Sequence, residues 1–265
     1  MEMTLKPRLV ELYQICRNDA YLSLHPKKKN PIKVDWRNQS VSAEDALAAN
    51  QMLQQNIGIL NGTTSGLIDI DLDCAEAVAF ADLFLPETVA SFGHEGNDRG
   101  HYLVAIKSSG KTRKFNMPDS SECLVELRSD GTQTMLPPSI HPSGHKLQFN
   151  NINDSAPAVD YADLLVATQR IAACSVIARS WSEGSRHQLA LAFAGMMYKA
   201  DFNQDLAENV VNTICNFTSD EELDDRLNAV ATTYAQNASS VSGYGIMVDI
   251  LGVNTARKIA EWLDI

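Results

Sequence analysis

The spacing of hydrophobic and polar positions changes at about residue 160. Before that point, short apolar runs alternate with turn residues such as Gly, Asn, Asp and Pro, which is typical of strands. These runs predict strands over 57–60, 66–72, 101–106, 123–127 and 133–136. Apolar positions three and four residues apart predict helices over 5–18, 43–55 and 75–84. The first part of the chain is therefore expected to mix strands with helices.

After a polar, linker-like stretch at 150–161, the helical spacing continues almost to the end of the chain. It predicts helices over 161–179, 186–200, 204–216, 221–235, 245–251 and 255–263. Ser219 and Glu222 have the spacing of a capping box, which would begin the fourth of these helices. We expect an α+β protein with an N-terminal mixed α/β domain at 1–160 and a smaller all-α helical bundle at 161–265.

Composition narrows the class of protein. The 265 residues suffice for two compact domains. The N-terminus lacks the regions of a signal peptide, and no apolar run approaches the ~18 residues of a membrane span. The five cysteines are odd in number and form no C-x-x-C pair, which favours reduced thiols and argues against a zinc site. The sequence therefore predicts a cytoplasmic protein with no membrane partner and no zinc.

The net charge of −11 argues against a general nucleic-acid binder, because contacts to phosphate depend on Lys and Arg. Two basic clusters interrupt this acidic background: "HPKKKNPIK" at 25–33 and "KSSGKTRKF" at 107–115. Each is either a solvated loop or a local patch that contacts phosphates.

The stretch "SGLIDIDLDC" places Asp69, Asp71 and Asp73 at every second position of a predicted strand, and therefore on one face. Clustered carboxylates repel one another unless a cation compensates them, and Asp is a poor strand former. A solvated edge strand is the alternative. Because Mg²⁺ and Mn²⁺ prefer carboxylate oxygens, we interpret the cluster as a divalent-metal site.

A metal held in this way points to phosphoryl or nucleotidyl transfer, in which two ions activate the attacking hydroxyl and stabilise the leaving pyrophosphate. Glu126 in "VELRSDG" is the best candidate for a further carboxylate, since it lies in an apolar strand just before a turn. Arg128 would share its face. A simple surface pair of Glu126 and Arg128 is the alternative interpretation.

Two further segments carry candidate phosphate ligands. His101 opens an apolar strand directly after Gly100, between the Asp cluster and Glu126. The segment "TMLPPSIHPSG" holds Ser139, His141 and Ser143 in a loop that its prolines make rigid. Such a loop is either only a turn or a way to present hydroxyls, imidazole and backbone N–H groups to a triphosphate.

These motifs, taken in order, resemble a known family. The succession of "NIGILNGTTSGLIDIDLD", "RGHYLV" and "VELRSDGTQTMLPPSIHPSG" is similar to the prim-pol domain of bifunctional DNA primase/polymerases, within the archaeo-eukaryotic primase superfamily. Upstream, "HPKKKNPIKVDW" resembles that family's lysine-proline-tryptophan segment. The helical region, with "WSEGSRHQLALAFAGMMY" and "IAEWLDI", is similar to the primase C-terminal helical module. The resemblance covers nearly the whole chain.

The resemblance assigns roles to single residues. The family's first motif is a pair of metal-binding acids, and their spacing from Gly66 places them at Asp71 and Asp73. Asp69 then becomes an additional acid behind the metal ligands. His101 matches the histidine that contacts the phosphates of the incoming nucleotide, and Glu126 matches the acid of the third motif. Further candidates for contact with nucleotide or template are Lys29, Arg99, Arg128, Ser139 and His141.

The chain departs from the superfamily pattern in its second motif. The usual Ser-x-His is replaced by Arg99-Gly100-His101, whose arginine retains the ability to donate to a phosphate. A literal Ser-x-His occurs later, at 139–141, and Asp160 would then be the third acid, but this register leaves Glu126 without a role. The sequence contains no cysteine-rich zinc insert and no P-loop, so a helicase would be a separate partner.

The resemblance implies a DNA primase/polymerase that acts in DNA replication by primer synthesis. It would use two Mg²⁺ or Mn²⁺ ions, a single-stranded DNA template and NTP or dNTP substrates. Arg186 and His187, at a predicted helix start in "GSRHQ", are candidates for contact with template or initiating nucleotide. Two rivals remain: a metal-dependent phosphodiesterase or nuclease, and a catalytically silent DNA-binding module for replication initiation. The resemblance also favours a mobile genetic element as the source.

Overall fold

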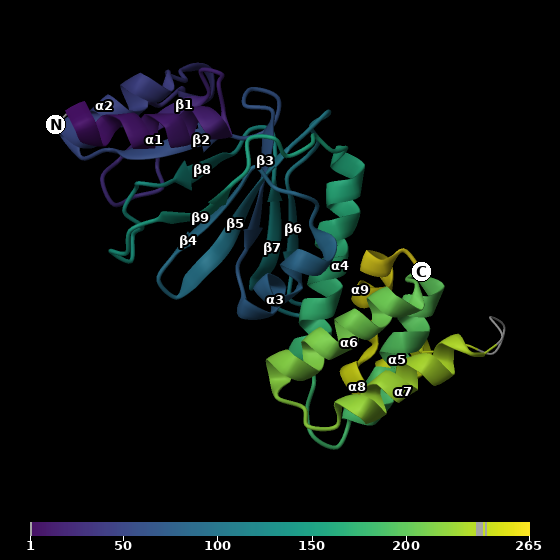
Figure 1. Cartoon of the computed structure of the whole chain (residues 1–265). Coiled ribbons are helices and arrows are strands. Elements are labelled where there is room, and N and C mark those ends of the chain that lie inside the picture. The colour runs from purple at the N-terminus through teal and green to yellow at the C-terminus, as the bar shows by residue number, and fades with distance from the viewer. Residues whose placement is uncertain (1, 237–240, 242) are drawn as a thin grey trace. The chain divides into compact units, whose positions relative to one another are not determined.

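The structure, a computed structural model, describes residues 2–236, 241 and 243–265 (Figure 1). The chain divides into two compact units. The first, here called the sheet unit, comprises Met1–Asp73, Pro86–Lys114 and Glu126–Leu165. The second, the helical unit, comprises Cys74–Leu85, Phe115–Val125 and Val166–Ile265. The predicted α+β class is confirmed. The domain boundary at 160/161 stays a prediction, and the segments 74–85 and 115–125 belong to the helical unit although they precede it.

Two β-sheets form the N-terminal part of the protein. A three-stranded sheet has the order β1-β2-β8, and a six-stranded sheet has the order β6-β7-β3-β5-β4-β9. The strands are β1 (Tyr21–Leu24), β2 (Asn56–Leu60), β3 (Leu67–Leu72), β4 (Ala90–His94), β5 (Asn97–Ala105), β6 (Arg113–Asn116), β7 (Cys123–Arg128), β8 (Gln133–Leu136) and β9 (Gln148–Ile152). The helices α1 (Glu2–Ile15) and α2 (Ala43–Leu53) lie beside the smaller sheet (Figure 1). A core of buried aliphatic and aromatic side chains joins these elements.

Strand β3 carries the aspartates and lies inside the larger sheet, between β7 and β5. Its six residues, including Asp69 and Asp71, are all buried. Ile68 and Ile70 point to the opposite face and are fully buried. The solvated edge strand considered from the sequence is therefore wrong for β3. Asp73 follows the last strand residue and is exposed.

The sequence analysis missed four strands: β1, β4, β6 and β9. Each has only four or five residues, and β6 and β9 are edges of the larger sheet. Strand β6 overlaps the end of the basic cluster at 107–115, for which a solvated loop was one of the two interpretations, and β9 overlaps the start of the predicted linker. Edge strands are frequently short and charged, because these features prevent pairing with other chains, so their hydrophobic alternation is weak.

The helical unit holds α3 (Ala75–Phe84), most of α4 (Tyr161–Arg179), α5 (Arg186–Lys199), α6 (Gln204–Thr218), α7 (Leu223–Tyr234), α8 (Tyr244–Leu251) and α9 (Val253–Leu263). The predicted capping box is wrong. Ser219 ends α6 in the left-handed conformation, with φ of 56°, and therefore lacks the extended backbone of an N-cap. The Asp220 carboxylate instead accepts the backbone N–H of Glu222 at 3.2 Å.

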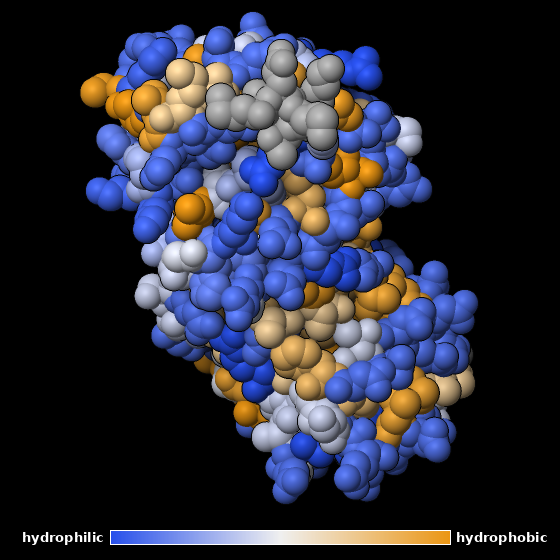
Figure 2. All heavy atoms as spheres, turned by 60° about the vertical axis from the view of Figure 1, so that its left-hand side comes forward, coloured by the Kyte–Doolittle hydropathy of each residue, from blue (hydrophilic) through white to orange (hydrophobic). Residues whose placement is uncertain are grey.

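Hydrophilic residues cover most of the face seen in Figure 2, and hydrophobic residues form separate patches on it. One helix corrects a sequence expectation. The sequence analysis expected no apolar segment long enough to span a membrane. By length and composition, however, α4 is such a segment. Core helices of soluble proteins pass the same test, and 61% of the apolar window of α4 is buried within the structure.

Candidate active site

The strand register aligns three side chains of neighbouring strands in one row. Phe92 of β4 lies opposite His101 of β5, and His101 lies opposite Asp71 of β3. Directly paired residues of neighbouring strands share a face of the sheet. The imidazole of His101 stacks on the Phe92 ring with centroids 4.9 Å apart. His101 and Asp71, which the sequence analysis placed in one site, are therefore neighbours.

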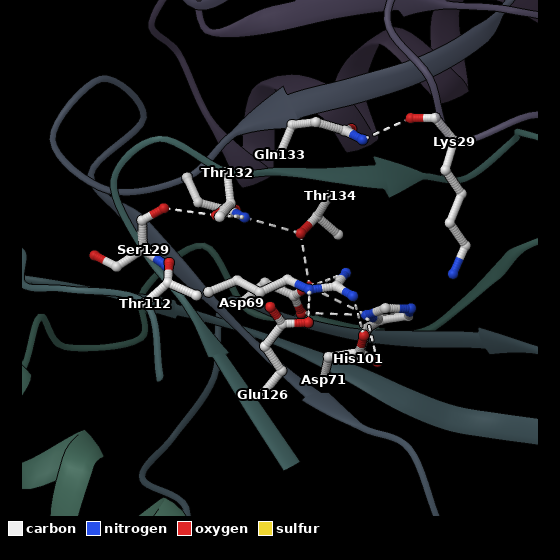
Figure 3. A network of polar contacts seen from close by, with 12 residues as sticks. Lys29, Asp69, Asp71, His101, Thr112, Glu126, Ser129, Thr132, Gln133 and Thr134 are labelled. Atoms are coloured by element: carbon white, nitrogen blue, oxygen red, sulfur yellow. Dashed lines mark hydrogen bonds and ion pairs between the residues drawn. The ribbon is translucent and has the colours of Figure 1, made fainter. Parts of the chain in front are cut away.

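Asp69 is the most deeply buried acid of the cluster, with no exposed surface. One carboxylate oxygen accepts the Thr134 hydroxyl at 2.6 Å and lies 3.1 Å from Nδ1 of His101 (Figure 3). Thr134 belongs to β8 in the smaller sheet, so this contact links the two sheets. Asp69, which the sequence analysis described as an additional acid, thus lies at the centre of this network of polar contacts.

The Arg128 guanidinium contacts the carboxylates of Asp69, Asp71 and Glu126. Its Nε lies 3.0 Å from Glu126, one terminal nitrogen lies 3.5 Å from Asp69, and the other contacts Asp71 closely. Glu126 also lies 3.4 Å from Nζ of Lys114. The exposed surface pair considered for Glu126 and Arg128 is wrong, since their side chains are only 10% and 18% exposed.

The pKa shifts follow from burial and neighbouring charge. Burial alone would raise the pKa of Asp69, but His101, Arg128 and the Thr134 hydroxyl hold it below its usual range. The pKa of Asp71 is raised, because burial and the adjacent Asp69 and Asp73 outweigh its cationic neighbours. Although burial opposes it, Asp71 and Asp69 raise the pKa of His101. The site thus favours a positively charged imidazole and accumulates negative charge around Asp71.

A polar pocket of about 220 Å³ opens beside this cluster. Cationic or potentially cationic groups line much of it: Lys29, His101, Arg128 and His141. Glu126 lies at the same wall, and Thr132, Gln133, Met135 and Leu147 complete the lining. A concave site with convergent donors beside clustered carboxylates suits a ligand that carries both an anion and bound cations.

Lys29 reaches the pocket because two side chains fix its loop. The amide of Gln133 donates to the Lys29 carbonyl at 2.7 Å, and that of Asn56 donates to the Lys28 carbonyl at 3.3 Å. Lys29 belongs to the first basic cluster, which consists mainly of turns and bends, and whether it contacts phosphates stays a prediction. Its ammonium end points toward the side of the site where His101 lies (Figure 3).

The proline loop contributes His141 but not its first serine to the pocket. Ser139 is fully buried, where its hydroxyl accepts the Ile57 N–H at 2.8 Å and lies 3.2 Å from the Ile57 carbonyl. His141 stacks on His94 with ring centroids 4.3 Å apart. Partial burial and the nearby Lys29 and other histidines lower the pKa of His141 to about 4. His141 is therefore a neutral ring at neutral pH.

Other sequence candidates lie outside this network. The Arg99 guanidinium lies over the Tyr102 ring, 5.5 Å from its centroid. Asp160, the third acid of the alternative register, is half-exposed and pairs with Lys107 at 3.3 Å. Neither residue lines the pocket described above.

The two candidates of the helical unit already have acidic partners. Arg186 lies 3.5 Å from Asp220, and His187 lies 2.7 Å from Asp225. Their predicted contact with template or initiating nucleotide stays a prediction. The His187 ring is about half exposed, whereas the Arg186 side chain is mostly buried.

The donor set fits Mg²⁺ or Mn²⁺ in kind, because Asp71, Asp73 and Glu126 offer only oxygen ligands. Among the described residues, no group of three His, Cys, Asp or Glu side chains is arranged to hold a metal ion. Arg128 contacts two of these acids in the present arrangement. An ion at this site would therefore compete with the guanidinium for the same oxygens.

Sequence analysis missed Thr134, Phe92 and Lys114. Phe92 belongs to a strand that was not predicted, and its register with His101 requires the β4–β5 pairing. The contact of Thr134 with Asp69 joins two sheets, which no local pattern reveals. Lys114 was part of a basic cluster noted for possible phosphate contact, and its partner in the structure is Glu126.

Comparison with protein families agrees with this geometry. Residues 12–161, which are more than half of the chain, match the Prim-Pol family, described as "Bifunctional DNA primase/polymerase, N-terminal". A comparison with curated proteins gives no match. The matched segment contains every residue of the carboxylate cluster and of the adjoining pocket. The chain therefore belongs to the Prim-Pol family of bifunctional DNA primase/polymerases.

Proposed function

We propose that this protein is a DNA primase/polymerase that catalyses template-directed nucleotidyl transfer in replication priming. The observation that carries the proposal is the position of a buried carboxylate cluster next to a pocket lined by cationic groups. The cluster and the adjacent Asp73 offer four acids to Arg128, His101 and the exposed Lys114. Such a surplus of carboxylates suits divalent cations, and the pocket suits a triphosphate.

In this proposal, Asp71, Asp73 and Glu126 hold two Mg²⁺ or Mn²⁺ ions. When bound, the ions would activate the attacking hydroxyl and stabilise the charge on the leaving group. Asp73 follows β3 directly and is exposed, so its carboxylate can turn toward an ion without leaving a buried position. The rigid strands fix Asp71 and Glu126.

The pocket residues bind the substrate. Lys29, His101 and Arg128 donate to the phosphates of an NTP or dNTP, while His141 contributes a neutral imidazole. The 3′-hydroxyl of the primer, or of a first nucleotide, attacks the α-phosphate. The bond between the α- and β-phosphates breaks, pyrophosphate leaves, and the hydroxyl proton passes to solvent or a basic group.

The remaining partners belong to the same proposal. The helical region would contact single-stranded DNA template or initiating nucleotide through Arg186 and His187. A separate helicase would unwind duplex DNA, and the protein would act in the cytoplasm of a cell that carries a mobile genetic element. The net charge of −11 favours a weak or partner-assisted grip on DNA.

The proposal is tested by primer synthesis on single-stranded templates, with NTP and dNTP pools compared in Mg²⁺ and Mn²⁺. We expect the wild type to extend and synthesise primers. The double variant Asp71→Ala/Asp73→Ala should lose incorporation and stay folded. Asp154→Ala, which changes an exposed acid of the sheet unit, is the matched control with wild-type activity.

Three results would contradict the proposal. Full extension by the double variant would remove the acids from catalysis. Shortening of labelled DNA without any growth would indicate a nuclease. DNA binding without metal-dependent incorporation, retained after loss of all three acids, would indicate a silent binding module.

A further inference from the structure

Asp69 is the acid that the family's spacing leaves without a role. It has no exposed surface, so a cation or nucleotide reaches it less readily than any other acid of the cluster. A buried carboxylate is costly unless hydrogen bonds and opposite charges compensate it. Each of its described partners is a group of the same site: Thr134, His101 and Arg128.

The Asp69 carboxylate is fixed from the smaller sheet. Thr134 donates to it at 2.6 Å, and the Asn61 amide donates to the Thr134 hydroxyl at 3.0 Å. Asn61 also donates to the hydroxyl of Thr132, whose own proton goes to the Ser129 carbonyl (Figure 3). This chain of hydrogen bonds leaves Asp69 one orientation, with an oxygen directed at His101.

Asp69 and Phe92 together determine how the His101 ring lies. Nδ1 of the ring is 3.1 Å and 3.3 Å from the two Asp69 oxygens, and the ring face stacks on Phe92. The other ring nitrogen, Nε2, points away from Asp69, toward the side where Lys29 lies (Figure 3). His101 lines the same pocket as Lys29 and His141.

We propose that Asp69 is a positioning residue, which holds Nδ1 of His101 and thereby directs Nε2 at the phosphates of the incoming nucleotide. This inference rests on the proposed function. A carboxylate that accepts from one ring nitrogen fixes both the tautomer and the orientation of an imidazole. Asp69 therefore acts on the nucleotide only through His101.

The contrast with Asp71 shows why a separate acid is needed. Asp71 also lies near Nδ1 of His101, at 3.4 Å, but it is the proposed ligand of the cations. A metal ion on Asp71 would occupy those oxygens, so Asp71 could then no longer hold the ring. Asp69 keeps the His101 ring oriented when Asp71 binds a cation. Asp71 would thus bind the metal, and Asp69 would position the histidine.

Calorimetric titration with a non-incorporable nucleoside triphosphate in Mg²⁺ tests the assignment. We expect Asp69→Asn to weaken nucleotide binding about tenfold, or about 1.4 kcal/mol. His101→Gln should weaken it by a similar factor, and the double variant should be no weaker than His101→Gln alone. Thr134→Val, which removes only the outer hydrogen bond, should give a smaller loss in the same direction. Asp154→Asn is the control.

Two further measurements separate positioning from metal ligation and from a merely structural role. Mn²⁺ binding should be retained in Asp69→Asn and lost in Asp71→Asn. At a pH high enough to remove one proton from the imidazolium, the ¹⁵N spectrum should show His101 protonated at Nδ1 in the wild type and a mixture of tautomers in Asp69→Asn. If Asp69→Asn is unfolded by circular dichroism, Thr134→Val provides the same comparison.

The outcomes distinguish the inference from the function on which it rests. A wild type that binds neither Mn²⁺ nor nucleotide contradicts the proposed function. If the wild type binds both, three results would contradict the inference alone. The first is unchanged nucleotide affinity and tautomer in Asp69→Asn, and the second is additive losses of affinity in Asp69→Asn and His101→Gln. The third is loss of Mn²⁺ binding in Asp69→Asn, as in Asp71→Asn.

Discussion

Each of the two units contains a buried cluster of acids and arginines, and the clusters differ in their charge balance. In the sheet unit, Asp69, Asp71 and Glu126 share Arg128 and His101. In the helical unit, a single buried acid, Asp220, is surrounded by donors. The first cluster and the adjacent Asp73 hold more acids than the cations Arg128, His101 and Lys114. In the second, the central acid meets two arginines, of which Arg226 also contacts Glu222 and Asp225.

In the helical cluster, groups of the protein itself satisfy the hydrogen-bonding capacity and the charge of Asp220. Asp220 accepts the Trp181 indole N–H at 2.8 Å and Nε of Arg226 at 3.0 Å, and Arg186 lies 3.5 Å away. These bonds hold the pKa of Asp220 below its usual range, although burial raises it. Such a cluster connects α5, α7 and the loop after α4, and its hydrogen bonds occupy both oxygens of Asp220.

The sheet cluster is compensated only in part, and it borders a pocket. One guanidinium serves three carboxylates, and the pKa of Asp71 remains raised. Because unpaired like charge costs stability, a protein that keeps it gains function from it. The comparison favours charge surplus beside a pocket, rather than burial of charge alone, as the mark of a candidate functional cluster.

The largest effect is expected in the helical cluster. Asp220→Ala should lower the free energy of unfolding by about 3 kcal/mol, because it removes the acceptor of the Trp181 N–H and the buried partner of Arg226, which would keep only Glu222 and Asp225. Denaturant titration measures the loss. Asp224→Ala, which changes an exposed acid of α7, is the control and should cost much less. Equal effects of the two variants would contradict a structural role for Asp220.

Arg128 provides the next comparison. Without metal, Arg128→Gln should destabilise the protein by about 2 kcal/mol, because three carboxylates lose their shared partner near an open pocket. Mn²⁺ should then raise the melting temperature of the variant more than that of the wild type, since ion and guanidinium compete for the same oxygens. An equal Mn²⁺ shift in both proteins would show that they do not compete.

The sequence predicted this site in its residues but not in its geometry. Alternation along β3 placed Asp69 and Asp71 on one face, and the strand of Glu126 was predicted within one residue of its observed bounds. The strand of His101 begins four residues earlier than predicted, at Asn97. The short edge strands were missed because their alternation is weak. The link from Thr134 to Asp69 depends on packing between two sheets, and the left-handed Ser219 depends on how α6 ends. Neither is encoded in local spacing.

A smaller effect is expected at a partly exposed pair of the helical unit. Arg179 donates twice to Glu76, at 2.9 and 3.0 Å, and this lowers the pKa of Glu76. Because the folded pKa lies below the unfolded value of 4.5, the stabilisation is present above pH 4.5 and is lost as pH falls through the folded pKa. Arg179→Met should cost about 1 kcal/mol at pH 7 and progressively less in acid. A cost independent of pH would contradict the role of Glu76.

The central claim is that the carboxylate surplus of the sheet cluster binds divalent cations. The most direct measurement is a Mn²⁺ titration of the wild type and of Glu126→Gln, followed by electron paramagnetic resonance of the free ion. We predict saturable binding to the wild type and binding at least about tenfold weaker in the variant, a difference of about 1.4 kcal/mol. Identical isotherms, or no saturable binding to the wild type, would contradict the claim.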